Sequence, residues 1–211
     1  MKRVINLDNW NRKEHFKFFS ALDDPFWGIT TTVDFTSIYQ QSKNMEVSFF
    51  LYSVHFLLKC INATTAFKLR IENGEVVEYD KINISPTIGR EDGTFGFGFF
   101  EYDTDLSLFI ENAEKEIHRV KNSTGLSFSK DTARADVISY SALPWFAFSE
   151  MKHAGSIQTG DSIPKISTGK LIQEKKKLLL PISISVHHGL VDGRNVAEFI
   201  QNVKDGQNNT L

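Results

Sequence analysis

The most continuous run of hydrophobic positions in this chain lies at 47–63, VSFFLYSVHFLLKCINA. It is longer than an ordinary strand, and its length predicts a buried helix. Apolar residues at helical spacing among charges predict further helices over 106–120 and 192–203, and a polar, aromatic segment predicts a short one over 11–22. Segments rich in β-branched and aromatic residues predict strands within 26–35, 67–79, 82–100, 136–145, 162–169 and 177–186.

Turn signals divide two of these strand segments. Glu-Asn-Gly-Glu at 72–75 predicts a hairpin, and Glu-Asp-Gly at 91–93 predicts a second turn between strands. Pro181 interrupts the clearest strand, KLLLPISISV, and predicts an edge position or a bulge there. Helices and strands interleave without an internal repeat, a low-complexity tract or an obvious linker, so the fold class is α/β or α+β.

Composition excludes several classes of protein. The 24 basic and 26 acidic residues give a formal net charge of −2, which argues against a nucleic-acid partner. The single cysteine, Cys60, excludes an intramolecular disulfide and a cysteine-based zinc cluster, and its apolar surroundings predict an inert buried thiol. No segment has the apolar length of a signal peptide or a membrane span, so we expect a soluble, cytoplasmic protein without a membrane partner.

The segment 186–193, VHHGLVDG, joins the clearest strand to the last helix and carries the most informative chemistry. Such a turn can hold a reactive side chain on a rigid support, and histidine suits general-base catalysis because its pKa lies near neutrality. A purely structural interpretation is equally open, in which Asp192 caps the helix, Gly189 and Gly193 serve turns, and one histidine is buried. No third ligand stands at a convincing spacing for a metal, so no metal site is expected.

Three motifs in this chain resemble those of the chloramphenicol acetyltransferases. HHGLVDG at 187–193 matches a His-His-x-x-x-Asp-Gly motif, which also marks the catalytic domains of dihydrolipoamide acyltransferases. NWNRKEHF at 9–16 is similar to the family's Asn-Trp-x-Arg-x-x-His-Phe segment, and SALPW at 141–145 is similar to its Ser-Ala-Leu-Pro-Trp segment. The motifs occur in family order over nearly the whole chain. The resemblance implies one domain over 1–211 with the CoA-dependent acyltransferase fold, an α/β (α+β) two-layer sandwich in which a mixed β-sheet packs with helices.

The resemblance also implies roles for particular residues. His188, the second histidine of the motif, corresponds to the general base that takes the proton of the acceptor hydroxyl. Ser141 corresponds to a hydrogen-bond donor to the oxyanion of the tetrahedral intermediate. Asp192 corresponds to an aspartate that pairs with the arginine of the N-terminal motif, here Arg12. The interpretations without function are a serine at a strand end and an exposed helix arginine.

The substrate contacts follow from the same resemblance. Lys170 and Trp145 correspond to positions near CoA, although an exposed lysine and a core tryptophan are the ordinary alternatives. Phe18, Phe19 and Ser167 correspond to acceptor-binding positions. Family members usually carry a tyrosine where this chain has Phe19, so one pocket hydroxyl is missing. The family's His-x-Glu-Thr-x-Thr-Phe run is absent from 85–100, the segment 146–153 is more polar than the family's, and 194–195 (Arg-Asn) replaces an aromatic residue and a histidine.

We therefore predict an acetyl-CoA-dependent O-acetyltransferase acting on chloramphenicol or a similar small molecule. The resemblance implies homotrimers whose active sites lie between subunits. The pocket differences leave open an acyltransferase with a different small alcohol or amine as acceptor. A non-catalytic trimeric binding protein of the same fold is the other alternative, although a decayed site would be expected to have lost at least one of Arg12, Ser141, His188 and Asp192.

Overall fold

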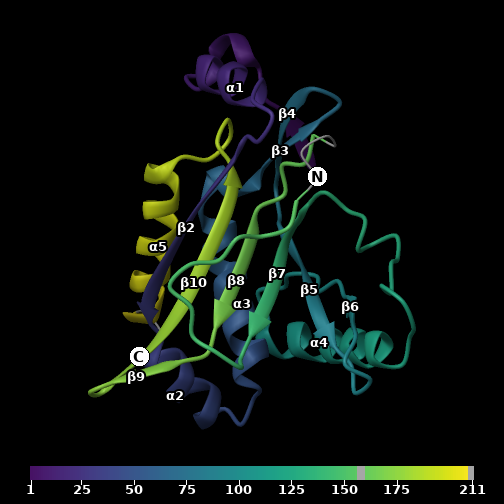
Figure 1. Ribbon diagram of the computed structural model, residues 1–211, viewed down its shortest axis with the longest axis vertical. Coiled ribbons are helices and arrows are strands. Elements are labelled where there is room, and N and C mark those ends of the chain that lie inside the picture. The colour runs from purple at the N-terminus through teal and green to yellow at the C-terminus, as the bar shows by residue number, and fades with distance from the viewer. Residues whose placement is uncertain (156–159, 209–211) are drawn as a thin grey trace.

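A mixed β-sheet with helices packed on one of its faces makes up most of the molecule (Figure 1). This computed structural model describes residues 1–155 and 160–208. The helices are α1 (Lys13–Ser20), α2 (Thr36–Asn44), α3 (Phe49–Ala63), α4 (Leu106–Lys121) and α5 (Gly193–Asn208), with short 3-10 helices at Leu7–Asn9 and Thr65–Lys68. The strands are β1 (Lys2–Val4), β2 (Phe26–Asp34), β3 (Leu69–Glu72), β4 (Glu75–Tyr79), β5 (Asn83–Gly89), β6 (Phe95–Phe97), β7 (Val137–Leu143), β8 (Lys165–Gly169), β9 (Ile172–Glu174) and β10 (Lys177–His187).

The larger sheet has the strand order β2-β10-β8-β7-β5-β6, and β9 pairs with the start of β10. Strands β5, β7 and β8 run parallel to one another, whereas the other pairs are antiparallel. A smaller antiparallel sheet, β1-β4-β3, contains the hairpin predicted from the sequence. Its turn places Asn73 at φ 51° and Gly74 at φ 81°, which are the positive angles that the common two-residue hairpin turn requires.

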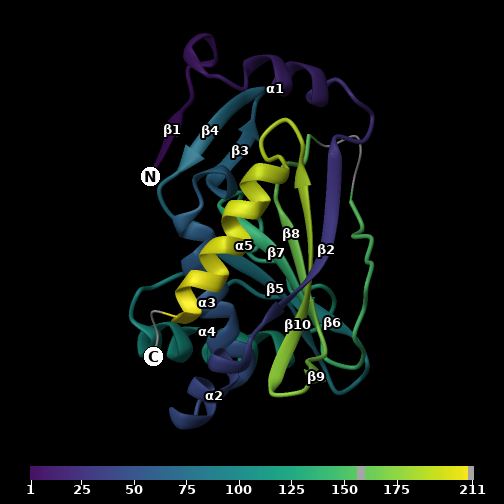
Figure 2. The same cartoon turned by 90° about the vertical axis from the view of Figure 1, so that its left-hand side faces the viewer.

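Alternation of apolar and polar residues gives the larger sheet two different faces. Ile182 and Ile184 of β10 are fully buried in the core, and Ser183 and Ser185 alternate with them on the opposite side. Figure 2 shows α3 and α5 against one side of the sheet and the segment between β7 and β8 on the other. We call the side away from the core the polar face; it carries Thr30, Ser85, Thr87, Ser139, Ser141, Lys165, Ser167, Ser183 and Ser185.

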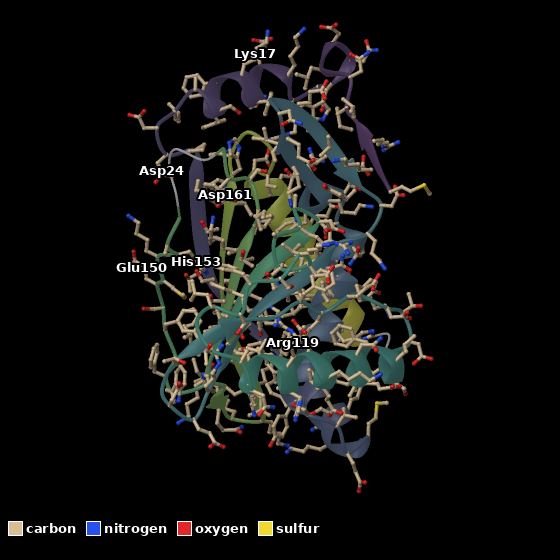
Figure 3. The ribbon with its side chains drawn as sticks, turned by 90° about the vertical axis from the view of Figure 1, so that its right-hand side faces the viewer. Lys17, Asp24, Arg119, Glu150, His153 and Asp161 are labelled. Atoms are coloured by element: carbon tan, nitrogen blue, oxygen red, sulfur yellow. The ribbon has the colours of Figure 1, made fainter. Side chains whose placement is uncertain are left out.

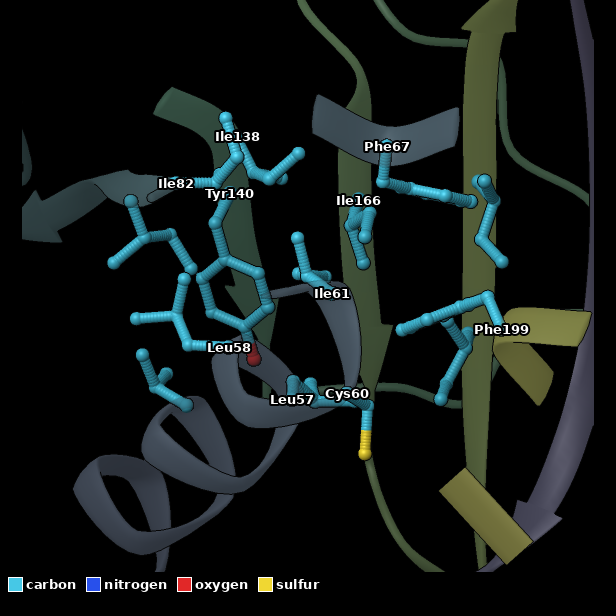
Figure 4. Packing of buried hydrophobic residues seen from close by; sticks show 14 of the residues in the cluster. Leu57, Leu58, Cys60, Ile61, Phe67, Ile82, Ile138, Tyr140, Ile166 and Phe199 are labelled. Atoms are coloured by element: carbon cyan, nitrogen blue, oxygen red, sulfur yellow. The ribbon is translucent and has the colours of Figure 1, made fainter. Parts of the chain in front are cut away.

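Helix α3 is the apolar run seen in the sequence, and it lies inside the molecule. Its Leu58 is fully buried and its Ile61 is 1% exposed. Both belong to the core that contains Tyr140 of β7, Ile166 of β8 and Phe199 of α5 (Figure 4). Full burial of one such aliphatic side chain stabilises a fold by about 1.5–3 kcal/mol, so this helix anchors the sheet that carries the functional residues.

The structure confirms the predicted α/β (α+β) two-layer architecture with a mixed sheet. The hydrophobic pattern does not predict β1 and β9, because each has three residues, all of them exposed, and is too short to show alternation. The edge position expected from Pro181 is wrong, since β10 lies between β2 and β8. Pro181 pairs with Thr32 of β2, and on its other side it falls between the residues that pair with β9 and those that pair with β8. Among the described residues, no helix is both long and apolar enough to cross a membrane.

Candidate active site

The turn that follows β10, residues 188–192, is tied to the N-terminal segment, and we call it the His188 turn. Arg12 precedes α1, Asp192 precedes α5, and a hydrogen-bonded ion pair joins Arg12 Nη1 to Asp192 Oδ2. Arg12 Nη2 also donates to the backbone oxygen of His188 at 3.1 Å. The arginine side chain is 16% exposed, so it is not a solvated surface charge. A single guanidinium thus holds both ends of the turn.

Asp192 is also the N-terminal cap of α5. Its Oδ1 accepts hydrogen bonds from the backbone nitrogens of Arg194 at 2.9 Å and Asn195 at 3.2 Å. In return, Asn195 Oδ1 accepts from the backbone nitrogen of Asp192 at 3.1 Å, which forms a reciprocal capping box. Burial raises the pKa of Asp192, but the hydrogen bonds from Arg12 and from these backbone groups outweigh it and lower the pKa below its ordinary value. The Asp192 carboxylate therefore caps α5 with one oxygen and pairs with Arg12 through the other.

Aromatic side chains enclose the His188 ring. It stacks on Phe19 of α1, with ring centroids 3.8 Å apart and planes inclined by 8°, and the Trp27 ring lies 5.4 Å away. Trp27 Nε1 donates to the backbone oxygen of Val191 at 3.0 Å, and the backbone nitrogen of His188 donates to Pro25 at 2.8 Å. The Nδ1 atom of His188 is buried and finds no hydrogen-bond partner among the described residues. Nε2 is therefore the ring nitrogen that a reactant can approach.

The neighbouring histidine, His187, is buried and packs beneath the turn. His187 is 3% exposed, and burial lowers its pKa to about 4, so its ring is neutral near pH 7. His187 Nδ1 accepts a hydrogen bond from the backbone nitrogen of Gly189 at 3.1 Å. A Cβ atom on Gly189 would lie 3.0 Å from the His187 ring and 3.3 Å from Phe16 Cα, which leaves little room for any other residue. This packing fixes the backbone from which the His188 side chain projects.

Ser141 lies on the polar face, distant from His188 of the same chain. Its Oγ accepts a hydrogen bond from Thr87 Oγ1 at 3.2 Å, which leaves its own hydroxyl hydrogen available. The sheet register pairs Ser141 with Ser167, and Ser167 with Ser183. His188 follows Ser183 by five positions, so it lies roughly 16 Å further along the strand direction. Within one chain, the structure does not bring Ser141 and His188 together.

The other predicted contact residues fall into two groups. Trp145 and Lys170 are exposed near the ends of β7 and β8, where the backbone nitrogen of Lys170 donates to Phe146 at 3.0 Å. Trp145 is 73% exposed, so the alternative of core packing is wrong for it. Phe18 of α1 is 63% exposed and packs edge-on against Phe19 at 5.2 Å. Two aromatic residues and a lysine are therefore open to solvent at opposite ends of the sheet.

A histidine that the motifs do not indicate lies against Ser167. His153 Nε2 is 3.0 Å from Ser167 Oγ, and Ser167 is fully buried. The Nδ1 atom of His153 is buried and has no hydrogen-bond partner in the part of the chain that the structure describes. The sequence signal for His153 is weak, because it is one histidine in an irregular segment. The higher polarity of 146–153 is the only hint of it.

The Cys60 thiol lies in the hydrophobic core. Cys60 is 4% exposed, and burial raises the pKa of its thiol to about 12, so the inert buried thiol predicted from the sequence is confirmed. Within residues 1–155 and 160–208, no group of three or more His, Cys, Asp or Glu side chains is arranged to hold a metal ion.

Comparisons with known proteins identify the family. The family model described as chloramphenicol acetyltransferase matches residues 2–204. The chain belongs to the chloramphenicol acetyltransferase family. Chloramphenicol acetyltransferase 3 of Escherichia coli is 27% identical over 208 residues, which cover 98% of this chain and 97% of that protein. A chloramphenicol acetyltransferase of Clostridioides difficile is 28% identical over 205 residues, covering 95% and 93% of the two chains.

Solved structures agree with this membership. A chloramphenicol acetyltransferase superposes with a TM-score of 0.90 at 29% identity, covering 98% of this chain and 100% of the other. A probable dihydrolipoamide acetyltransferase from Listeria monocytogenes shares the fold, with a TM-score of 0.69 at 13% identity, covering 98% and 94% of the two chains. As a family member, the chain is an acyltransferase of the chloramphenicol acetyltransferase type with the CoA-dependent acyltransferase fold.

Proposed function

We propose that this chain transfers the acetyl group of acetyl-CoA to a hydroxyl of a small acceptor, with His188 as general base. The observation that carries the proposal is the braced turn, in which Arg12 binds Asp192 and the His188 backbone while Phe19 fixes the ring. A base that is already held in one orientation needs no further ordering before it takes the proton. Positioned general bases typically contribute about 10²–10⁴ in rate.

Acetyl-CoA supplies an acyl group that is already activated as a thioester. His188 Nε2 takes the proton from the acceptor hydroxyl as that oxygen bonds to the acyl carbon. The Ser141 hydroxyl donates a hydrogen bond to the oxyanion that forms. His188 holds the proton until the carbon–sulfur bond breaks, and then passes it to the departing thiolate. No metal and no covalent acetyl-enzyme enter this sequence.

The separation of Ser141 and His188 supports a site shared between two copies of the chain. Residues roughly 16 Å apart along one sheet cannot act on the same acyl carbon. In the proposed homotrimer, His188 of one copy faces Ser141 and the polar face of the next. The trimer is the family's typical assembly, and it closes a ring of identical interfaces.

On the CoA side, we assign Lys170 and Trp145. Lys170 is an exposed cation that can contact a phosphate as a point charge. Trp145 offers a large exposed ring beside it for the adenine or the pantetheine arm. Phe18, Phe19 and Ser167 are assigned to the acceptor side, and chloramphenicol is the first acceptor to test.

A different small alcohol or amine is the second candidate acceptor, and the Phe19 ring favours it. Phe19 lies on the His188 ring where the family usually has tyrosine, so a polar contact of the acceptor is missing. A pocket that loses one hydroxyl can select another acceptor without any change in the chemistry.

The test is the release of CoA thiol by purified protein with acetyl-CoA and a panel of alcohols and amines that includes chloramphenicol. His188→Ala should lower kcat by about 10²–10⁴ with every acceptor that the unaltered protein uses. The matched control is His118→Ala, an exposed histidine on α4, which should leave kcat unchanged. Equal turnover by the His188→Ala and unaltered proteins would exclude His188 as the base.

A further inference from the structure

The polar face of the sheet, beside which we place the acceptor, carries two rows of hydrophilic side chains. Across the sheet, one row of paired positions joins Ser85, Ser139, Lys165 and Ser185. Paired residues project to the same side of a sheet, so these hydroxyls and the ammonium group line one surface. The next row contains Thr87, Ser141, Ser167, Ser183 and Thr30.

The segment that crosses the polar face adds an imidazole to it. Ser183 Oγ donates to the backbone oxygen of Met151 at 3.5 Å, which places this segment over the sheet. Two residues later, His153 Nε2 meets the fully buried Ser167 Oγ at 3.0 Å. Burial and the nearby charge of Lys165 lower the pKa of His153, so its ring is neutral near pH 7. A neutral imidazole has one donor and one acceptor nitrogen, and the buried Nδ1 has no partner among residues 1–155 and 160–208.

His153 lines a cavity of about 920 Å³ beside this face, large enough for a small acceptor. An ion pair between Lys165 Nζ and Asp161 Oδ2, 2.6 Å long, lies in its wall, and its side chains are 13% and 22% exposed. The same ammonium group lies 4.0 Å from the centre of the Phe26 ring. Figure 3 shows Asp24, Glu150, His153 and Asp161 gathered on one side of the molecule, and all four line the cavity.

On the basis of the proposed transferase function, we propose that the acceptor is a polyhydroxylated molecule of the sugar or cyclitol type, and that His153 and the Lys165–Asp161 pair select it. Hydroxyls on several sides of such an acceptor can pair with the imidazole, the Ser185 hydroxyl and the Lys165–Asp161 pair, all of which line the cavity. The Phe26 and Trp27 rings in the cavity wall offer flat surfaces for its carbon skeleton. An aromatic acceptor would leave the buried Nδ1 of His153 without a partner, and sites built for hydrogen bonds discriminate strongly against such molecules.

The test compares two kinds of acceptor at saturating acetyl-CoA. Methyl α-D-glucopyranoside and myo-inositol represent the polyhydroxylated class, and chloramphenicol and 2-phenylethanol represent the aromatic class. We expect the unaltered protein to have its highest kcat/KM with a polyhydroxylated acceptor. His153→Leu should lower that kcat/KM by roughly tenfold to a hundredfold, and should change the aromatic values by less than about threefold. The KM for acetyl-CoA should stay the same.

Two further variants separate recognition from folding. His153→Gln keeps a polar group that can reach Ser167, and it should retain more of the kcat/KM for polyhydroxylated acceptors than His153→Leu does. His118→Leu, at an exposed position on α4, should match the unaltered protein with all four acceptors. A preference for chloramphenicol, or an equal loss with all four acceptors in His153→Leu, would overturn the proposal.

A direct binding measurement distinguishes failure of this inference from failure of the transferase assignment. If none of the four acceptors is acetylated, the proposed acetyl transfer fails for both classes, and the ¹⁵N resonances of the His153 ring still report binding. Methyl α-D-glucopyranoside or myo-inositol should shift these resonances, and chloramphenicol should not. Shifts caused by chloramphenicol alone, or by none of the acceptors, would contradict a polyhydroxylated acceptor.

Discussion

The His188 turn and the polar face are built in opposite ways. In the turn, the two Nη atoms of Arg12 and the Asp192 carboxylate are engaged within the chain, through an ion pair, a bond to the His188 backbone and a capping box, while Arg12 Nε and His188 Nδ1 have no partner among the described residues. On the polar face, Ser141 keeps an unused hydroxyl hydrogen and His153 keeps an unpartnered nitrogen. Buried polar groups are normally paired. The turn is therefore braced from both ends within one chain, whereas we propose that the polar face is completed by a ligand and a second copy of the chain.

The largest effect that sharpens this comparison is expected at Ser141. Ser141→Ala should lower kcat by about 10²–10³, because one oxyanion donor is lost, and should leave the free energy of unfolding nearly unchanged. Thiol-release kinetics and denaturant unfolding measure the two quantities. Ser107→Ala on α4 is the matched control for an exposed hydroxyl. A loss of stability as large as the loss of activity would make Ser141 a structural residue.

For Asp192, in the His188 turn, we expect a marked loss in the free energy of unfolding. Asp192→Ala removes a cap and leaves Arg12 partly buried without its counter-charge, and should lower the free energy of unfolding by about 2–4 kcal/mol. Asp192→Asn keeps the cap and should lose less. Asp131→Asn removes a surface partner of Arg134 and should cost under about 0.5 kcal/mol. If all three variants unfold at the same denaturant concentration, the brace contributes nothing to stability.

The pH dependence of stability tests the packing beneath the turn. The pKa of His187 is about 4 in the folded protein, against an ordinary value of 6.5, so the unfolded chain binds its proton more tightly. The contribution of neutral His187 is therefore complete above pH 6.5 and is lost as the pH falls toward 4. Between pH 7 and pH 5 this should lower the free energy of unfolding by about 2 kcal/mol. His187→Gln should reduce that dependence, and an identical pH profile in the variant would show that His187 is not its source.

The smallest effect is expected at the exposed end of the sheet. Lys170→Ala should raise the KM for acetyl-CoA about threefold with kcat unchanged, because exposed ion contacts contribute little. Lys115→Ala, on α4, is the matched surface control. A change in kcat without a change in this KM would remove Lys170 from the CoA side.

The sequence predicts the fold and the His188 turn better than it predicts the arrangement of side chains on the polar face. The length of the apolar run predicts α3, and the β-branched residues of 177–186 predict β10; both elements form where the sequence places them. The contact of Arg12 with Asp192 spans 180 residues and was accessible only through family motifs. His153 lies in an irregular segment, where no period predicts which side chain meets Ser167. Nor can motif order reveal that Ser141 lies far from His188 within one chain.

Complementation between two inactive variants tests the shared site most directly. His188→Ala and Ser141→Ala chains carrying different affinity tags are expressed together, and the mixed oligomers are purified through both tags. In each mixed trimer, about one interface in three should join an intact His188 to an intact Ser141 and restore turnover in proportion. Mixed oligomers that remain as inactive as either parent would show that the two residues serve one and the same chain, and would contradict a site shared between copies.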